Sequence, residues 1–101
     1  MGKFKVDYKS SKNATEAYDK VKAYLGNAED IRKLDDKMQC TFEDAKKLCK
    51  IQGSQFKADI TVLDSATGST IEVHVDLPFL LMAFKSKIEE MLKKNLSKHV
   101  G

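Results

Sequence analysis

The chain has 101 residues, of which 42% are apolar and 33% are charged, and its formal net charge is +3. This composition is typical of a folded globular protein, and we expect one domain spanning residues 1–101. No apolar run approaches the roughly 20 residues of a transmembrane helix. Positive and negative residues are interspersed, and no basic stripe contains aromatic residues, so we expect no nucleic-acid partner.

The first six residues contain no apolar stretch of the kind found in a secretory signal, so we expect a cytoplasmic protein. Cys40 and Cys49 are then expected to be reduced thiols, with a cross-strand disulfide as the alternative. A metal site is not predicted, because no second pair of ligands lies at a suitable spacing. The chain also has no Gly-rich phosphate loop, nucleophile elbow or two-histidine helix motif, so we predict no catalytic residue and no cofactor.

The first strand is predicted at residues 3–9, where Phe4, Val6 and Tyr8 alternate with polar residues. A turn follows, and then Asn13 is a candidate helix N-cap, with Glu16 placed to complete a capping box. The helix behind it has an apolar stripe formed by Ala14, Ala17, Tyr18, Val21, Tyr24 and Leu25.

Gly26 is a natural end for this first helix. Beyond it, Ala28, Ile31 and Leu34 fit a further short helical turn. One long helix that contains the glycine is the alternative.

A hairpin is predicted next from alternating residues on both sides of a four-residue loop at 43–46. In this register Cys40 lies opposite Cys49, Met38 opposite Ile51, and Phe42 opposite Lys47. The first two pairs place apolar side chains on one face, as a sheet with a single buried side requires.

Two longer strands and a helix complete the chain. Residues 56–62 and 71–77 alternate between apolar and polar side chains, and a loop at 64–69 joins them as an antiparallel pair. Pro78 ends the second strand because it has no N–H, and its fixed φ suits the first turn of a helix. Residues 79–98 contain no Gly or Pro and form that helix.

The predicted order is therefore β-α-β-β-β-β-α. Each strand has one apolar and one mostly polar face. An α+β fold meets this pattern, with an antiparallel five-stranded sheet and with the N-terminal helix and the long C-terminal helix packed on one face.

Three segments resemble a known family, and they read GSQFKADI at 53–60, IEVHVDLPFLL at 71–81 and FKSKIEE at 84–90, followed by Leu92 and Leu96. The chain resembles the polyhydroxyalkanoic acid system proteins, small bacterial proteins encoded near polyester-granule genes. The resemblance implies a cytoplasmic bacterial protein, associated with granules, with no established enzymatic activity. It offers no catalytic motif. The element order also resembles a shortened START-like helix-grip fold, whose full-length members often hold an apolar ligand between helix and sheet.

The six consecutive apolar residues at 79–84 are the main candidate for a functional surface. They surround the helix, whereas one packed face covers only part of such a run. One interpretation places them in the core, between the sheet and the first helix. The other leaves Phe79, Leu80, Met82 and Phe84 available to bind a polyester granule surface, an apolar small molecule or a second copy of the chain. The sequence is compatible with a monomer or a homodimer.

A second hypothesis is a ligand carrier or an enzyme with an internal apolar pocket. Tyr18 and Tyr24, with Tyr8, would line the pocket together with the C-terminal helix, because buried tyrosines need hydrogen-bond partners. A void near roughly 300 Å³ would favour this hypothesis. A third hypothesis is a homo-oligomeric structural domain that uses the apolar run as its interface.

His74 lies between Glu72 and Asp76 on the polar side of its strand, and Asp59 is expected opposite it. A histidine flanked by carboxylates could act as a base or a weak metal ligand. An open sheet face does not exclude water, so we favour a solvated histidine.

Overall fold

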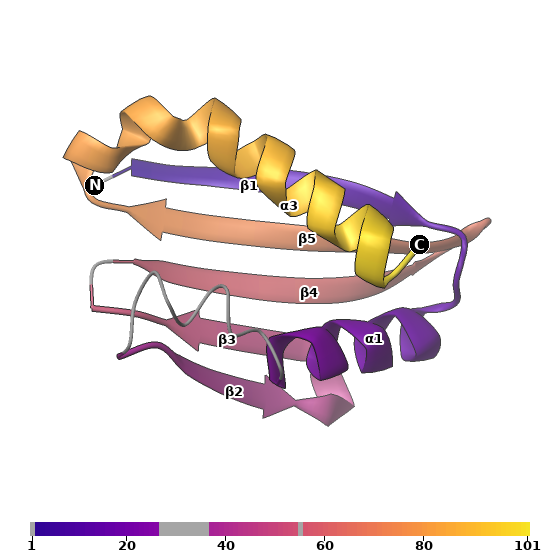
Figure 1. Ribbon diagram of the computed structural model, residues 1–101. Coiled ribbons are helices and arrows are strands. Elements are labelled where there is room, and N and C mark those ends of the chain that lie inside the picture. The colour runs from indigo at the N-terminus through magenta and orange to yellow at the C-terminus, as the bar shows by residue number, and fades with distance from the viewer. Residues whose placement is uncertain (1, 27–36, 55) are drawn as a thin grey trace.

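The computed structural model describes residues 2–26, 37–54 and 56–101. Five strands form one antiparallel sheet in the order β1-β5-β4-β3-β2. The elements are β1 (Gly2–Ser10), α1 (Ala14–Gly26), β2 (Gln39–Glu43), η1 (Asp44–Lys46), β3 (Leu48–Gln52), β4 (Lys57–Ser65), β5 (Gly68–Leu77), η2 (Phe79–Phe84) and α3 (Lys85–His99). Both α1 and α3 lie on the same face of the sheet (Figure 1), which confirms the predicted fold class.

The core lies between this covered face and the two helices. Strand β5 lies between β1 and β4, and its side chains alternate between buried and more exposed positions along its length. The buried apolar side chains of the three longest strands are Phe4 and Val6 on β1, Ala58, Ile60 and Val62 on β4, and Ile71, Val73, Val75 and Leu77 on β5. The predicted alternation therefore places one side of each strand in the core, and the opposite face of the sheet remains polar.

The turn between β4 and β5 is shorter than the predicted loop at 64–69, so that prediction was wrong. The ladder continues to the pair Ser65 and Gly68, which leaves two residues in the turn. Gly68 has a φ of +147° and lies directly against the backbone carbonyl of Ser10. A side chain at this position would meet that backbone, so glycine allows the long hairpin to pack against the end of β1.

The register predicted for the β2–β3 hairpin was also wrong. Phe42 pairs with Cys49 and Cys40 pairs with Ile51, so each pair is displaced by two residues from the prediction. The cause lies in the turn, where η1 is followed by Lys47 in the left-handed conformation, at φ 50° and ψ 50°. This turn uses residues 44–47 rather than 43–46, and Glu43 joins the strand. A displacement of two residues keeps the same side chains facing the core.

Helix α1 begins as predicted, because the Asn13 side-chain oxygen accepts a hydrogen bond of 2.8 Å from the Glu16 backbone N–H. The Glu16 carboxylate lies 3.7 Å from the Lys12 ammonium. The stripe of Ala14, Ala17, Tyr18, Val21 and Leu25 is buried. The further helical turn suggested for Ala28, Ile31 and Leu34 lies outside the described residues.

The C-terminal helix is not uniform over residues 79–98 as predicted. Its first six residues form the 3₁₀ helix η2, and the α-helix α3 begins at Lys85. Val100 is buried at the far end, and the Gly101 carbonyl accepts a hydrogen bond of 3.1 Å from the Ser10 hydroxyl. These contacts attach the C-terminal end of α3 to the sheet.

Candidate functional site: an apolar tip and an apolar cavity

The exposed apolar surface of the protein is concentrated on η2. Pro78 ends β5, and its carbonyl accepts a 2.9 Å hydrogen bond from the Leu81 N–H, which starts the 3₁₀ helix. Phe79 is 78% exposed and Leu80 is 88% exposed, and Phe84 at the end of η2 is 54% exposed. We call Phe79, Leu80 and Phe84 the apolar tip. The interpretation that buried the whole run between the sheet and α1 does not hold for these three side chains.

The rest of η2 holds the apolar tip in place. Met82 is half-buried and packs directly on Gly2, where an added Cβ would overlap the methionine side chain. Leu81 is also half-buried and packs against the core. The Lys85 ammonium lies 5.7 Å from the centre of the Phe4 ring, in reach of a cation–π contact. The apolar tip is therefore held at the end of the sheet by packing contacts of the neighbouring residues of η2.

Lysine side chains follow the apolar tip along α3. Lys85 and Lys87 are exposed at the start of the helix, and Lys93 and Lys94 are exposed two turns further along. Long lysine side chains can lay their methylene groups along an apolar surface while the ammonium groups remain in water. Such an arrangement suits a boundary between an apolar phase and water.

An apolar cavity of about 390 Å³ lies between the sheet and the two helices. The sheet side of the cavity is lined by Ile51, Ser54, Phe56, Ala58, Ile60, Val73, Val75 and Leu77, and the helix side by Val21, Tyr24, Leu25, Leu81, Ile88, Met91, Leu92, Asn95 and Leu96. The volume lies within the usual range for small-molecule sites, which is about 300 to 1,000 Å³.

The structure separates the tyrosines that were predicted to line a pocket. Tyr24 lines the cavity, and its ring stacks on the ring of His99 at 4.3 Å between centroids. Tyr18 does not line it. Its ring is buried, and its hydroxyl donates a hydrogen bond of 2.6 Å to the Asp44 carboxylate.

This Tyr18 contact fixes α1 to the turn between β2 and β3. The Lys22 ammonium completes the cluster, at 3.0 Å from Asp44 Oδ1. Burial raises the pKa of Tyr18, and the hydrogen bond to the Asp44 carboxylate raises it further. The hydrogen bonds from Tyr18 and Lys22 lower the pKa of Asp44. The cluster has a structural role, and none of its three residues lines the cavity.

Several cavity residues were not predicted as site residues, notably Leu81, Ile88, Leu92 and Asn95. The apolar members recur at helical spacing, which indicates an inward face, but such a stripe does not distinguish a filled interface from a void. Within the apolar run at 79–84, Leu81 lines the cavity. The four predicted site residues of that run, Phe79, Leu80, Met82 and Phe84, do not line it.

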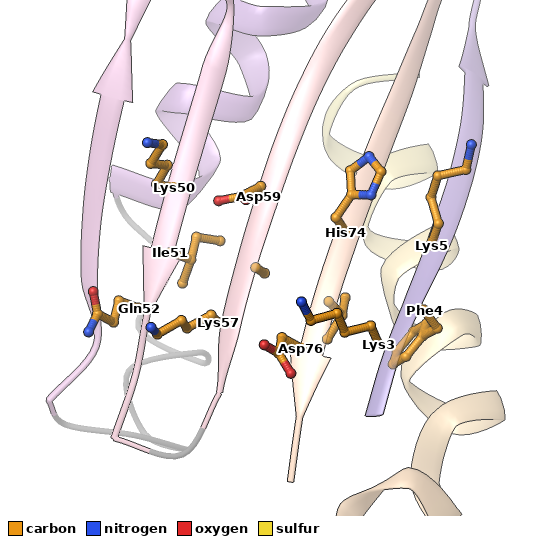
Figure 2. Close-up of a pocket in the computed structure, with 12 residues that line it drawn as sticks. Lys3, Phe4, Lys5, Lys50, Ile51, Gln52, Lys57, Asp59, His74 and Asp76 are labelled. Carbon is orange, nitrogen blue, oxygen red and sulfur yellow. The ribbon is translucent and has the colours of Figure 1, made fainter. Parts of the chain in front are cut away.

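The opposite, polar face of the sheet carries a larger and shallower depression of about 690 Å³ (Figure 2). In it, Lys50, Asp59, His74 and Lys5 follow one another across four neighbouring strands. Glu72 Oε1 lies 3.5 Å from His74 Nε2. This open surface carries charges of both signs, and Lys50 lies opposite Asp59 on the neighbouring strand, which suits cross-strand pairing and solvation. Of the two, the apolar cavity has the properties of a candidate ligand site, since a molecule inside it would be removed from water.

Cys40 and Cys49 are not joined by a disulfide. Burial raises the pKa of the Cys49 thiol to about 12, so this thiol is not a nucleophile at neutral pH. Within residues 2–26, 37–54 and 56–101, no three His, Cys, Asp or Glu side chains are grouped so as to hold a metal ion. In the same ranges, no helix has the length and apolar character needed to cross a membrane.

The fold and the site together define a small α+β protein in which two helices cover one face of an antiparallel sheet and leave an apolar cavity beneath them. The crystal structure of TTHA0849 from Thermus thermophilus has a similar fold, with a TM-score of 0.61 and 8% sequence identity over 98% of this chain and 94% of that chain. At this identity the likeness shows the fold alone. Among curated proteins no match was found.

A protein-family model described as "Putative polyhydroxyalkanoic acid system protein" matches residues 5–100. The match spans nearly the whole chain, and the protein therefore belongs to this family. The resemblance carried by the second half of the sequence is confirmed, and the match extends it through the first strand and α1.

Proposed function

We propose that the protein is a non-enzymatic accessory protein that attaches to polyhydroxyalkanoate granules in the bacterial cytoplasm through the apolar tip. The family match supports a connection with the polyhydroxyalkanoate system. The observation that carries the proposal is the exposure of Phe79 and Leu80, at 78% and 88%, on a short helix held firmly against the sheet. Adjacent exposed aromatic and aliphatic side chains mark interaction surfaces on soluble proteins.

The free energy gained by burying the apolar tip is sufficient for reversible attachment to an apolar surface. Full burial of a Phe or Leu side chain contributes about 1.5 to 3 kcal/mol. Most of this area is still exposed on Phe79 and Leu80, so burying both against an apolar phase contributes about 3 to 5 kcal/mol. That free energy corresponds to a partition constant of roughly two to four powers of ten. Lys85 and Lys87 would add attraction to any anionic groups at the granule boundary.

The test is sedimentation of the purified protein with washed polyhydroxyalkanoate particles. The double variant Phe79→Ser and Leu80→Ser is expected to bind about a hundredfold more weakly than the wild type. The matched control is Leu63→Ser, which changes another exposed leucine, 44% exposed, on β4. Retention of full binding by the double variant would refute the proposal.

Self-association is the main competing use of the same surface. Light scattering on the wild type and the double variant separates the two cases. A wild-type dimer that becomes monomeric in the double variant, and a wild type that does not sediment with the particles, would make the apolar tip a subunit interface instead.

A second candidate function, the carriage of a small apolar molecule, is favoured by the cavity of about 390 Å³. The cavity exceeds the roughly 300 Å³ at which small-molecule sites begin. An enzymatic role for it is less favoured, because Tyr24 is the one ionisable side chain among its described lining residues. A tyrosine alone does not supply the paired acid and base that most transfer or hydrolytic reactions need.

A further inference from the structure

The cavity combines a long apolar wall with neutral polar groups, and none of its lining residues within 2–26, 37–54 and 56–101 is charged. Tyr24, Ser54 and Asn95 supply the polar side chains, and every other described lining residue is apolar. An ionised group placed inside would lose its hydration without gaining a charged partner, which is strongly unfavourable. The part of any ligand that enters the cavity must therefore be uncharged.

The lining residues on strand β5 and those on helix α3 extend over nearly the same distance along the cavity. On the sheet side the lining of β5 runs from Val73 to Leu77, and four residues of an extended strand span about 13 Å. On the helix side the lining of α3 runs from Ile88 to Leu96, and eight residues of an α-helix span about 12 Å. Across the sheet the lining spans β3, β4 and β5, which is about 10 Å, so its longer dimension runs along the strands and a chain laid in that direction fits it.

The volume sets the size of that chain. An apolar cavity of about 150 Å³ accepts one benzene molecule, which has six carbon atoms. By the same ratio, about 390 Å³ accommodates roughly 15 non-hydrogen atoms. One medium-length chain fits this volume, whereas a two-chain lipid does not.

The polar groups lie at the two ends of the cavity. Ser54 belongs to the turn that joins β3 and β4, at the η2 end of the sheet. Asn95 lies near the other end, one helical turn before His99, whose ring stacks on Tyr24. Between them the lining is apolar. A ligand with oxygen atoms at one or both ends of an aliphatic chain is complementary to this pattern.

From these observations we propose that the cavity binds a single uncharged aliphatic chain of about ten carbon atoms with an ester or hydroxyl end. The inference rests on the second candidate function and is independent of granule attachment. Aliphatic carbons lie along Ile60, Val73 and Leu92, and the oxygen atoms lie near Tyr24 and Asn95.

Isothermal titration with methyl decanoate, below its solubility limit, tests the proposal. We expect saturable binding to one site, and affinity for the decanoate ion weaker by about tenfold or more, because the carboxylate has no charged partner in the cavity. Absence of saturable binding of the ester would overturn the proposal. Equal affinity for the ester and the ion would overturn the requirement for an uncharged ligand.

Filling the cavity is the decisive control. Ala58→Phe places a ring in the cavity from β4, and Thr61→Phe places the same ring on the opposite face of that strand. Ala58→Phe should bind methyl decanoate about tenfold more weakly or not at all, and Thr61→Phe should bind like the wild type. If circular dichroism shows that Ala58→Phe is unfolded, Val75→Phe takes its place. A folded cavity-filling variant with unchanged affinity would overturn the proposal.

The same variants separate this inference from granule attachment. The double variant Phe79→Ser and Leu80→Ser should titrate with methyl decanoate like the wild type, since neither residue lines the cavity. Ala58→Phe should still sediment with polyhydroxyalkanoate particles. Either function can therefore fail without affecting the test of the other.

Discussion

Substitution of Leu80 and Met82 by aspartate tests which side of η2 faces the core. The two residues are two positions apart in one apolar run, and the sequence alone gives both the same expectation. In the structure Leu80 is 88% exposed, whereas Met82 is half-buried against Gly2. The aspartate variants should therefore differ in stability, although each replaces an apolar side chain by the same carboxylate.

The magnitudes follow from the burial of each side chain. Leu80→Asp loses little buried area, so the free energy of unfolding should change by no more than about 0.5 kcal/mol. Met82→Asp loses part of the roughly 1.5 to 3 kcal/mol that a buried methionine contributes, and it brings a carboxylate against apolar surface. We expect a loss of about 2 to 4 kcal/mol for Met82→Asp.

Urea unfolding followed by circular dichroism measures both changes. With a slope of about 1.5 kcal/mol per molar urea, the midpoint of Met82→Asp should fall by about 1 to 3 M, and that of Leu80→Asp should hardly move. Met82→Leu conserves size and apolarity and should lose less than about 1.5 kcal/mol. A destabilised Leu80→Asp, or a Met82→Asp as stable as the wild type, would show that the inward and outward sides of η2 are wrongly assigned.

Two further predictions concern the cysteines and the Asp44 cluster. Because burial raises the pKa of Cys49 to about 12, a disulfide reagent should modify Cys40 in the folded protein and Cys49 only in urea; equal rates without urea would contradict this. Hydrogen bonds from Tyr18 and Lys22 lower the pKa of Asp44, so its carboxylate stabilises the fold above about pH 4, and that contribution disappears as the pH falls through the folded-state pKa. Urea unfolding of Asp44→Asn should show a deficit at pH 7 that shrinks towards pH 2, whereas a deficit independent of pH would refute the linkage.

The sheet could be predicted from the sequence because each strand has a single buried side. A period of two residues identifies β1, β4 and β5 directly, and Pro78 marks the end of β5. The Asn13 cap marks the start of α1 for an equally local reason. These features depend on neighbouring residues along the chain, so they can be predicted without knowledge of the tertiary structure.

The hairpin register and the length of the β4–β5 turn depend on contacts between distant residues. Lys47 adopts a left-handed conformation that its side chain does not indicate, and this conformation moves the turn by one residue. The sequence predicts Gly68 within a loop, whereas in the structure it lets the hairpin approach Ser10. Alternation fixes which face is buried but leaves displacements by two residues undetermined.

An internal pocket was one hypothesis from the sequence, but its existence could not be decided, because a helical stripe gives the direction of side chains and not the distance between two packed surfaces. Ile88 and Leu92 have the helical spacing of an inward face, and both line the cavity. Whether they fill the space above Val73 and Val75 depends on how high α3 is held. That height depends on its attachments, with Met82 on Gly2 at one end and the Ser10–Gly101 hydrogen bond at the other.

The six apolar residues of η2 do not share one environment. For this reason the sequence could not show whether the run is buried or exposed. A 3₁₀ helix has three residues per turn, so consecutive side chains point about 120° apart. Leu80 points into solvent, Leu81 into the cavity, and Met82 onto Gly2. Because Leu80 and Leu81 are joined by one peptide bond, their Cα atoms are about 3.8 Å apart, and the surface that binds the apolar tip must lie close to one end of the cavity. A substitution at position 81 would disturb both proposed sites, so experiments that separate them must use Leu80 and Ala58.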